Sequence, residues 1–104
     1  MEVGRIDALK GMLEEDPQDA MLHYLLGSEY FKGGRYGEAI EATRTYLSLA
    51  EDEGAAYRTL AQSLERIGKI SEARIAYRQG IDAAGRYGHP GMAAEFEAAL
   101  KELA

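Results

Sequence analysis

Two segments of the chain, GGRYGEAI at residues 33–40 and IGKISEAR at residues 67–74, repeat one pattern at an interval of thirty-four residues. Each gives Gly, a basic residue, a large apolar residue, any residue and then Glu-Ala. Repeats of this length indicate a supersecondary unit that cannot bury its apolar face alone, so that neighbouring units stack on one another. A chain of 104 residues has room for only a short stack.

The repeat extends beyond these two segments. Residues 20–53 align with residues 54–87 without gaps and share seven identities: Leu26/Leu60, Gly34/Gly68, Glu38/Glu72, Ala39/Ala73, Ala42/Ala76, Arg44/Arg78 and Ala50/Ala84. The identities mark an apolar face, a turn, and the small residues where two helices would cross. Valine occurs once and the chain has only two prolines, so the composition favours an all-α fold.

Apolar residues recur at helical spacing on both sides of each glycine turn. In the first copy they are Leu22, His23, Leu26, Gly27 and Tyr30, and after Gly33-Gly34 they are Tyr36, Ala39, Ile40, Thr43, Tyr46 and Leu47. In the second copy they are Tyr57, Leu60, Ala61 and Leu64, and after Gly68 they are Ile70, Ala73, Tyr77 and Ile81. A connection this short makes the two helices of each copy antiparallel.

Two flanking segments complete the expected set of about six antiparallel helices in one domain, residues 1–104. Residues 3–15 place Val3, Ile6, Leu9, Met12 and Leu13 on one side of a helix, and residues 90–103 place Met92, Phe96, Leu100 and Leu103 in line. Pro90 suits the first position of its helix. For the same reason we expect Pro17 to open the helix of the first copy, with Asp16 as its cap.

These residues resemble the tetratricopeptide repeats, whose first helix carries a bulky residue, then Leu-Gly, then Tyr, and whose second helix carries Ala and an aromatic residue. The first copy reads His23, Leu26-Gly27, Tyr30 and Ala39, and the second reads Tyr57, Leu60-Ala61, Leu64, Ala73 and Tyr77. The resemblance implies a right-handed α-α superhelix, and the chain is similar to small, free-standing bacterial members of this family. It implies a leading half-repeat at 3–17, full repeats at 20–53 and 54–87, and a capping helix at 90–103.

The sequence departs from the family pattern at Thr43 and Tyr46 in the second helix of the first copy, and the closing Pro is missing after both full copies. Thr43 replaces an aromatic residue, Tyr46 stands where a small residue is usual, and Gly80 takes that small position in the second copy. We expect Gly27 to lie against Ala39, and Ala61 against Ala73, at the closest points of the two hairpins.

First helices of stacked hairpins line one face, and their residues that are not used for core contacts define a candidate partner-binding groove. By register these are Met21, Tyr24, Ser28, Phe31, Lys32, Arg58, Gln62, Glu65 and Arg66. A partner peptide would use Tyr24 and Phe31 as anchors, and Arg58 or Arg66 would pair with its acidic groups. In the alternative, the chain's own end helices cover this stripe.

Charge is distributed unevenly along the chain. Residues 1–53 carry five basic and twelve acidic side chains, a net of −7, whereas residues 54–87 carry six and three, a net of +3. The remaining residues carry one and three, so the total is −6, which disfavours binding to nucleic acid. The leading hypothesis is a protein-interaction module that binds a protein or peptide. The alternative is a structural unit that forms homodimers or larger assemblies through its end helices.

Other classes of function find little support in the sequence. There is no cysteine, and neither His23 nor His89 has metal-ligand or nucleophile partners at suitable spacing, so we expect no enzyme activity, metal or cofactor. Gly33-Gly34 is not followed by Lys-Ser/Thr, as a phosphate-binding loop would require. Without a signal-like N-terminus or a long apolar run, the expected location is cytoplasmic, with no membrane partner.

Overall fold

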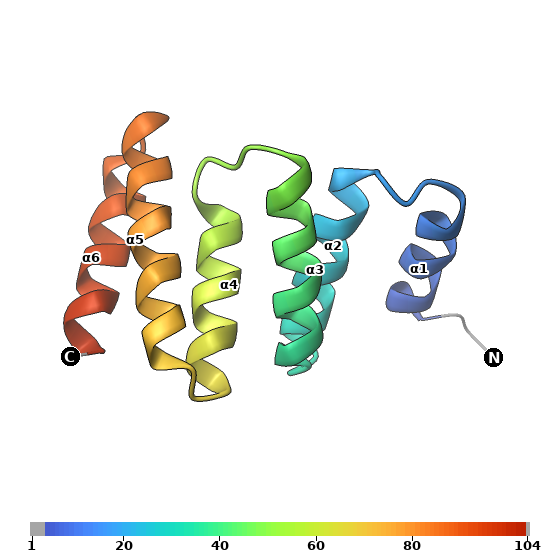
Figure 1. Cartoon of the computed structure of the whole chain (residues 1–104), viewed down its shortest axis with the longest axis horizontal. Coiled ribbons are helices and arrows are strands. Elements are labelled where there is room, and N and C mark those ends of the chain that lie inside the picture. The colour runs from blue at the N-terminus through green and yellow to red at the C-terminus, as the bar shows by residue number, and fades with distance from the viewer. Residues whose placement is uncertain (1–3, 104) are drawn as a thin grey trace.

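The computed structural model describes residues 4–103 and contains six helices in that range (Figure 1). They are α1 (Arg5–Glu15), α2 (Ala20–Lys32), α3 (Tyr36–Leu49), α4 (Ala55–Arg66), α5 (Ile70–Arg86) and α6 (Pro90–Glu102). No strand occurs among the described residues, so the all-α prediction of about six helices is confirmed. Val3, expected on the first stripe, lies outside the described residues.

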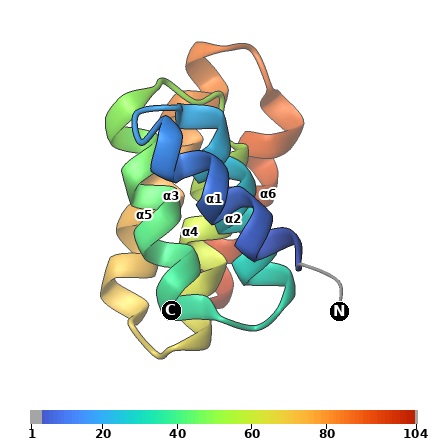
Figure 2. The same cartoon turned by 90° about the vertical axis from the view of Figure 1, so that its right-hand side faces the viewer.

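Successive helices run antiparallel and form an elongated stack of 44 × 28 × 19 Å. Viewed along the stack, α3 and α5 lie on one side and α2 and α6 on the other, with α4 between them (Figure 2). We call the side formed by α2, α4 and α6 the first-helix face and the side formed by α3 and α5 the second-helix face. The connections also fall on two edges: the α2–α3 and α4–α5 turns lie on one edge, and the remaining three connections lie on the other (Figure 1).

Three helices end in the same glycine turn. Gly34, Gly68 and Gly88 have φ values of 74°, 80° and 75°, which place them in the left-handed region that glycine adopts without strain. In each turn the next residue donates its N–H back across the helix end, as Arg35 does to the carbonyl of Tyr30 at 2.9 Å. The sequence therefore located the stops after α2 and α4 correctly.

The start of α2 differs from the prediction. Asp19, not Asp16, is the cap: its side chain accepts a hydrogen bond from the Leu22 N–H at 3.3 Å, and the helix begins at Ala20. Pro17 lies in the turn before the helix, where the Asp19 N–H bonds to the Asp16 carbonyl. The chain needs these residues to reverse direction between two antiparallel helices, so they cannot also form the first turn of α2.

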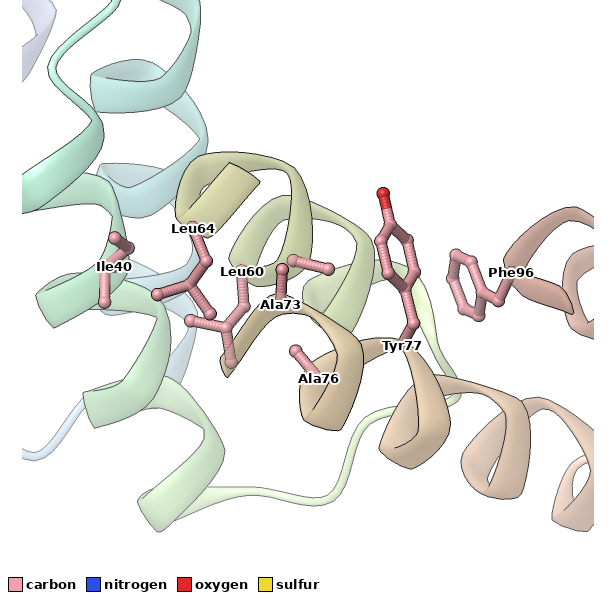
Figure 3. Packing of buried hydrophobic residues seen from close by; sticks show 8 residues of the cluster. Ile40, Leu60, Leu64, Ala73, Ala76, Tyr77 and Phe96 are labelled. Atoms are coloured by element: carbon pink, nitrogen blue, oxygen red, sulfur yellow. The ribbon is translucent and has the colours of Figure 1, made fainter. Parts of the chain in front are cut away.

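The apolar faces of the helices meet in two clusters. The larger one joins α3, α4, α5 and α6, and Figure 3 shows seven of its eight buried residues under labels: Ile40, Leu60, Leu64, Ala73, Ala76, Tyr77 and Phe96, with Ala61 as the eighth. The smaller joins α1 to the first hairpin through Leu9, Leu26, Tyr30, Ala39 and Ala42. Two residues of the predicted stripes are exposed instead: Met12 in the last turn of α1 and Ile70, the first residue of α5.

Small residues set the closest approaches between helices. A Cβ added to Gly27 would lie 2.6 Å from Thr43 Oγ1 and 3.6 Å from the Ala39 carbonyl oxygen, so α2 comes closest to α3 at Thr43, one turn beyond the predicted Ala39. Thr43 is small enough for this contact, which explains why it replaces an aromatic residue. Ala61 and Ala73 are both fully buried in the larger cluster.

Charged residues stand at the crossing positions of the two end helices. Continuing the repeat interval places Glu95 of α6 where Gly27 and Ala61 stand, and Arg5 of α1 where Ala39 and Ala73 stand. A charged side chain at a tight helix crossing would lose its water at a cost in free energy, so these two positions differ in character from the small residues at the internal crossings. Both residues instead form ion pairs within the chain, Arg5 with Glu29 and Glu95 with Arg58, each at 2.6 Å.

The α3–α4 loop is held by one carboxylate. Asp52 accepts hydrogen bonds from the N–H groups of Gly54 and Ala56 at 2.8 and 2.9 Å, and from the Tyr46 hydroxyl at 2.9 Å. It thus supplies the start of α4 with acceptors that Gly54, the residue before the helix, cannot provide. Burial, and then the bond to Asp52, raise the pKa of the Tyr46 hydroxyl well above its usual value.

Candidate partner-binding surface

Four of the nine predicted groove residues line one hollow on the first-helix face. It has a volume of about 400 Å³ and is lined by Phe31 of α2, by Gln62, Glu65 and Arg66 of α4, and by Tyr77 of α5. Residues 62, 65 and 66 face the same side because they are three or four positions apart on a helix. Tyr77 was predicted only as a core residue, yet its hydroxyl reaches the hollow and donates a hydrogen bond to Glu65.

Aromatic contacts with α3 and α5 form the walls of this hollow. The Phe31 ring meets the Tyr36 ring edge-on at 5.7 Å, and the Arg66 guanidinium lies 5.6 Å from the Tyr36 ring centre and donates to its hydroxyl at 3.3 Å. On the other side, burial and the bond to Glu65 raise the pKa of the Tyr77 hydroxyl, which donates its proton to that bond. The hollow thus combines an apolar wall with an amide, a carboxylate and a guanidinium.

Arg58, another predicted groove residue, is engaged by the closing helix. It donates two hydrogen bonds to the Glu95 carboxylate of α6, at 2.6 and 2.8 Å, and its guanidinium lies 5.5 Å from the centre of the Phe96 ring. The hydrogen bonds from Arg58 lower the pKa of Glu95, and those same bonds raise the pKa of Arg58. The sequence did not reveal this partner, because Arg58 and Glu95 are thirty-seven residues apart.

The remaining predicted groove residues lie outside the hollow. Tyr24 is half-buried with its ring 5.1 Å from that of Tyr46, and Ser28 is half-buried further along α2. Met21 and Lys32 lie at opposite ends of α2 and are exposed. Neither end helix fully buries Tyr24, Phe31 or Arg58, so the predicted stripe is accessible in part.

The second-helix face carries larger hollows that the sequence analysis did not anticipate. Two adjoining ones, of about 540 and 470 Å³, lie between α3 and α5 and share Leu47, Tyr57, Ile75 and Gln79. Two cross-links bridge this trough: Arg44 to Glu72 at 3.0 Å and the Tyr87 hydroxyl to Glu51 at 2.6 Å. Ile75 is a large apolar residue on the exposed side of α5. Its position outside the apolar stripe of this helix was the sequence signal that could have indicated the trough.

The two histidines have structural partners. His23 Nε2 lies 2.9 Å from the Pro17 carbonyl oxygen and ties α2 to the preceding turn. His89 Nε2 lies 2.5 Å from a carboxylate oxygen of Glu53 and joins the start of α6 to the α3–α4 loop. Across residues 4–103, no group of three or more His, Asp or Glu side chains is arranged to hold a metal ion. Over the same range, none of the helices has the length and apolar character needed to cross a bilayer.

Stacked antiparallel hairpins with small residues at each crossing define an α-helical repeat protein. Two overlapping stretches, residues 6–56 and 24–89, match the family model of the tetratricopeptide repeat, so the chain belongs to the tetratricopeptide repeat family. Repeats of this family generally serve as protein-interaction modules.

One similar solved structure is the solution structure of protein BPP2914 from Bordetella parapertussis. It superposes with a TM-score of 0.83 and 24% sequence identity, over 98% of this chain and 89% of that one. At this identity the similarity establishes the fold. Among curated proteins, none matches the sequence.

Proposed function

We propose that the chain binds a short segment of a partner protein on its first-helix face, with an apolar side chain of that segment in the hollow beside Phe31. The observation that carries the proposal is the convergence of Phe31, Gln62, Glu65 and Arg66, from two helices, on one hollow of about 400 Å³. An apolar wall next to a few polar groups is the usual composition of a peptide or ligand site.

The polar groups suit the main chain of a bound segment. The Gln62 side-chain amide makes no hydrogen bond within the described residues, so both its carbonyl and its NH₂ group are available to a peptide backbone. Glu65 and Arg66 are held in place by tyrosines, which lowers the entropy lost when they bind a partner. Arg58 remains a candidate for an acidic residue of the partner, which would have to compete with Glu95.

The test compares two glutamines on opposite faces. A random heptapeptide library displayed on phage is selected against the wild-type chain, and one enriched peptide is titrated calorimetrically against Gln62→Ala, Phe31→Ala and the control Gln79→Ala. We expect the first two substitutions to weaken binding about tenfold, or roughly 1.4 kcal/mol, and the control to leave it unchanged. Binding that depends on Gln79 but not on Gln62 would place the ligand in the trough between α3 and α5 and refute the proposal.

A further inference from the structure

Two exposed patches of opposite charge lie on opposite edges of the stack. The acidic patch surrounds the α1–α2 loop and consists of Met12, Glu14, Glu15, Asp16 and Met21. The basic patch surrounds the α4–α5 turn and consists of Arg66, Ile67, Lys69 and Ile70. Figure 1 shows the α1–α2 loop at the upper edge and the α4–α5 turn at the lower edge. The patches therefore point away from each other and cannot meet within one chain.

Each patch also exposes apolar side chains. Met12 and Met21 are 54% and 56% exposed, and Ile67 and Ile70 are 43% and 38% exposed. These are four of the six large apolar residues that are exposed among the described residues, and they flank a connection on each edge. An apolar centre with a charged rim is the arrangement found at protein interfaces.

The charges of the two patches are complementary and are largely free. Within residues 4–103, Glu14, Glu15 and Asp16 form no ion pair. On the basic edge, Lys69 has only a 3.8 Å contact with Glu72, and Arg66 contacts a tyrosine but no carboxylate. Lys32, the last residue of α2, adds a positive charge beside the α2–α3 turn on the same edge.

We propose that the occupant of each patch is a second copy of this chain, with the acidic patch of one molecule against the basic patch of the next. Such a contact is heterologous, so it leaves one patch of each sign free and builds open chains instead of closed dimers. This goes beyond peptide binding, and the two patches share only Arg66 with the hollow beside Phe31. It also differs from assembly by stacking of the end helices, because the patches lie at the α1–α2 loop and the α4–α5 turn.

The salt concentration determines how strongly the molecules associate. Two molecules of net charge −6 repel each other at long range. At about 0.1 M salt the Debye length is roughly 10 Å, so local patches outweigh net charge, and at about 1 M even contact pairs are weakened. We therefore expect association to be strongest at intermediate salt.

Sedimentation velocity of the wild-type chain, from about 10 µM to about 1 mM in 0.1 M salt, tests the proposal. We expect the weight-average sedimentation coefficient to rise with concentration. Either Glu14→Lys/Glu15→Lys or Ile67→Glu/Lys69→Glu alone should abolish the rise, and an equimolar mixture of the two variants should restore it. The control Asp82→Lys/Glu97→Lys changes the net charge as much as the first variant does, at exposed positions away from both patches, and should behave like the wild type.

Three results would overturn the proposal. One is a wild-type chain that stays monomeric up to about 1 mM at every salt concentration. Another is association that survives in either patch variant. The third is a mixture of the two variants that fails to associate, because each variant keeps one intact patch and those two patches should bind each other. Circular dichroism shows whether each variant is folded, and all four positions in the patch variants are exposed, so folding should be retained.

Discussion

The ring of Phe96 fills the space that a side chain on Gly80 would occupy. A Cβ added to Gly80 would lie 2.7 Å from Phe96 Cε2 and 3.1 Å from Tyr57 Cβ. Phe96 is fully buried and also meets the Tyr77 ring at 5.8 Å, so it has no room to move. Gly80 therefore allows α6 to pack closely against α5, because it leaves room for the Phe96 ring.

Replacing Gly80 by Ala should destabilise the protein by about 1–3 kcal/mol, despite the better helix propensity of alanine, because the added methyl group displaces Phe96 and α6. The matched control is Gly85→Ala in the same helix, where an added Cβ has nothing within 4 Å. That variant should be stabilised by about 0.5–1 kcal/mol. Urea unfolding followed by circular dichroism measures both. Equal effects of the two substitutions would contradict the contact.

Replacing Ala39 by Leu tests the crossing of α2 and α3. Ala39 is fully buried, and its carbonyl oxygen faces Gly27, so extra methyl groups should overpack the crossing at a cost of about 1–3 kcal/mol. Ala98→Leu, on the exposed side of α6, should change the free energy of unfolding by less than about 0.5 kcal/mol. Thermal melting distinguishes the two. An unchanged melting temperature in the Ala39 variant would be inconsistent with this register.

Replacing Ser63 by Ala should stabilise the protein by about 1 kcal/mol. The Ser63 hydroxyl is fully buried and has no hydrogen-bond partner among the described residues, so its loss of hydration is uncompensated. Ser48, whose hydroxyl is exposed and donates to the Thr45 carbonyl at 2.7 Å, is the control. Its replacement by Ala should have almost no effect. A lower midpoint of urea unfolding for the Ser63 variant would show that the hydroxyl does have a partner.

Replacing Asp52 by Ala should cost about 2–3 kcal/mol, because it removes three hydrogen bonds that hold the start of α4 and the Tyr46 hydroxyl. Tyr46→Phe removes only one of them and should cost about 1 kcal/mol. The control Glu41→Ala, at an exposed position without a side-chain hydrogen bond or ion pair among the described residues, should cost less than about 0.5 kcal/mol. Chemical denaturation gives the three values. If the Asp52 variant is as stable as the Tyr46 variant, the bonds from Asp52 to the Gly54 and Ala56 N–H groups do not stabilise the start of α4.

The Arg58–Glu95 pair predicts a small loss of stability in acid. Arg58 lowers the pKa of Glu95 below its usual 4.5, so the pair contributes stability above pH 4.5 and loses it as the pH falls below that value. The difference in unfolding free energy between wild type and Glu95→Gln should therefore shrink between about pH 5 and pH 3, by at most about 1 kcal/mol, because both side chains are partly exposed. Glu97→Gln, without an ion pair among the described residues, is the control. A difference that stays constant over this range would contradict the pair.

The local sequence determined the helices and their order. The end of a helix can be predicted from a single residue such as Gly34, because only glycine adopts the left-handed turn without strain. The spacing of residues such as Leu60, Leu64 and Ala73 fixed which faces are buried, since helical periodicity depends on the chain alone.

Tertiary structure decided what the sequence left open. The partner of Arg58, the position of Phe96 over Gly80, and the trough between α3 and α5 each join residues from helices that are distant in the chain. The helix start at Asp19 also depended on where α1 leaves room for the chain to turn. The periodicity of apolar residues along each helix predicts which residues are buried. Which buried residues contact each other depends on the distance and the crossing angle between neighbouring helices.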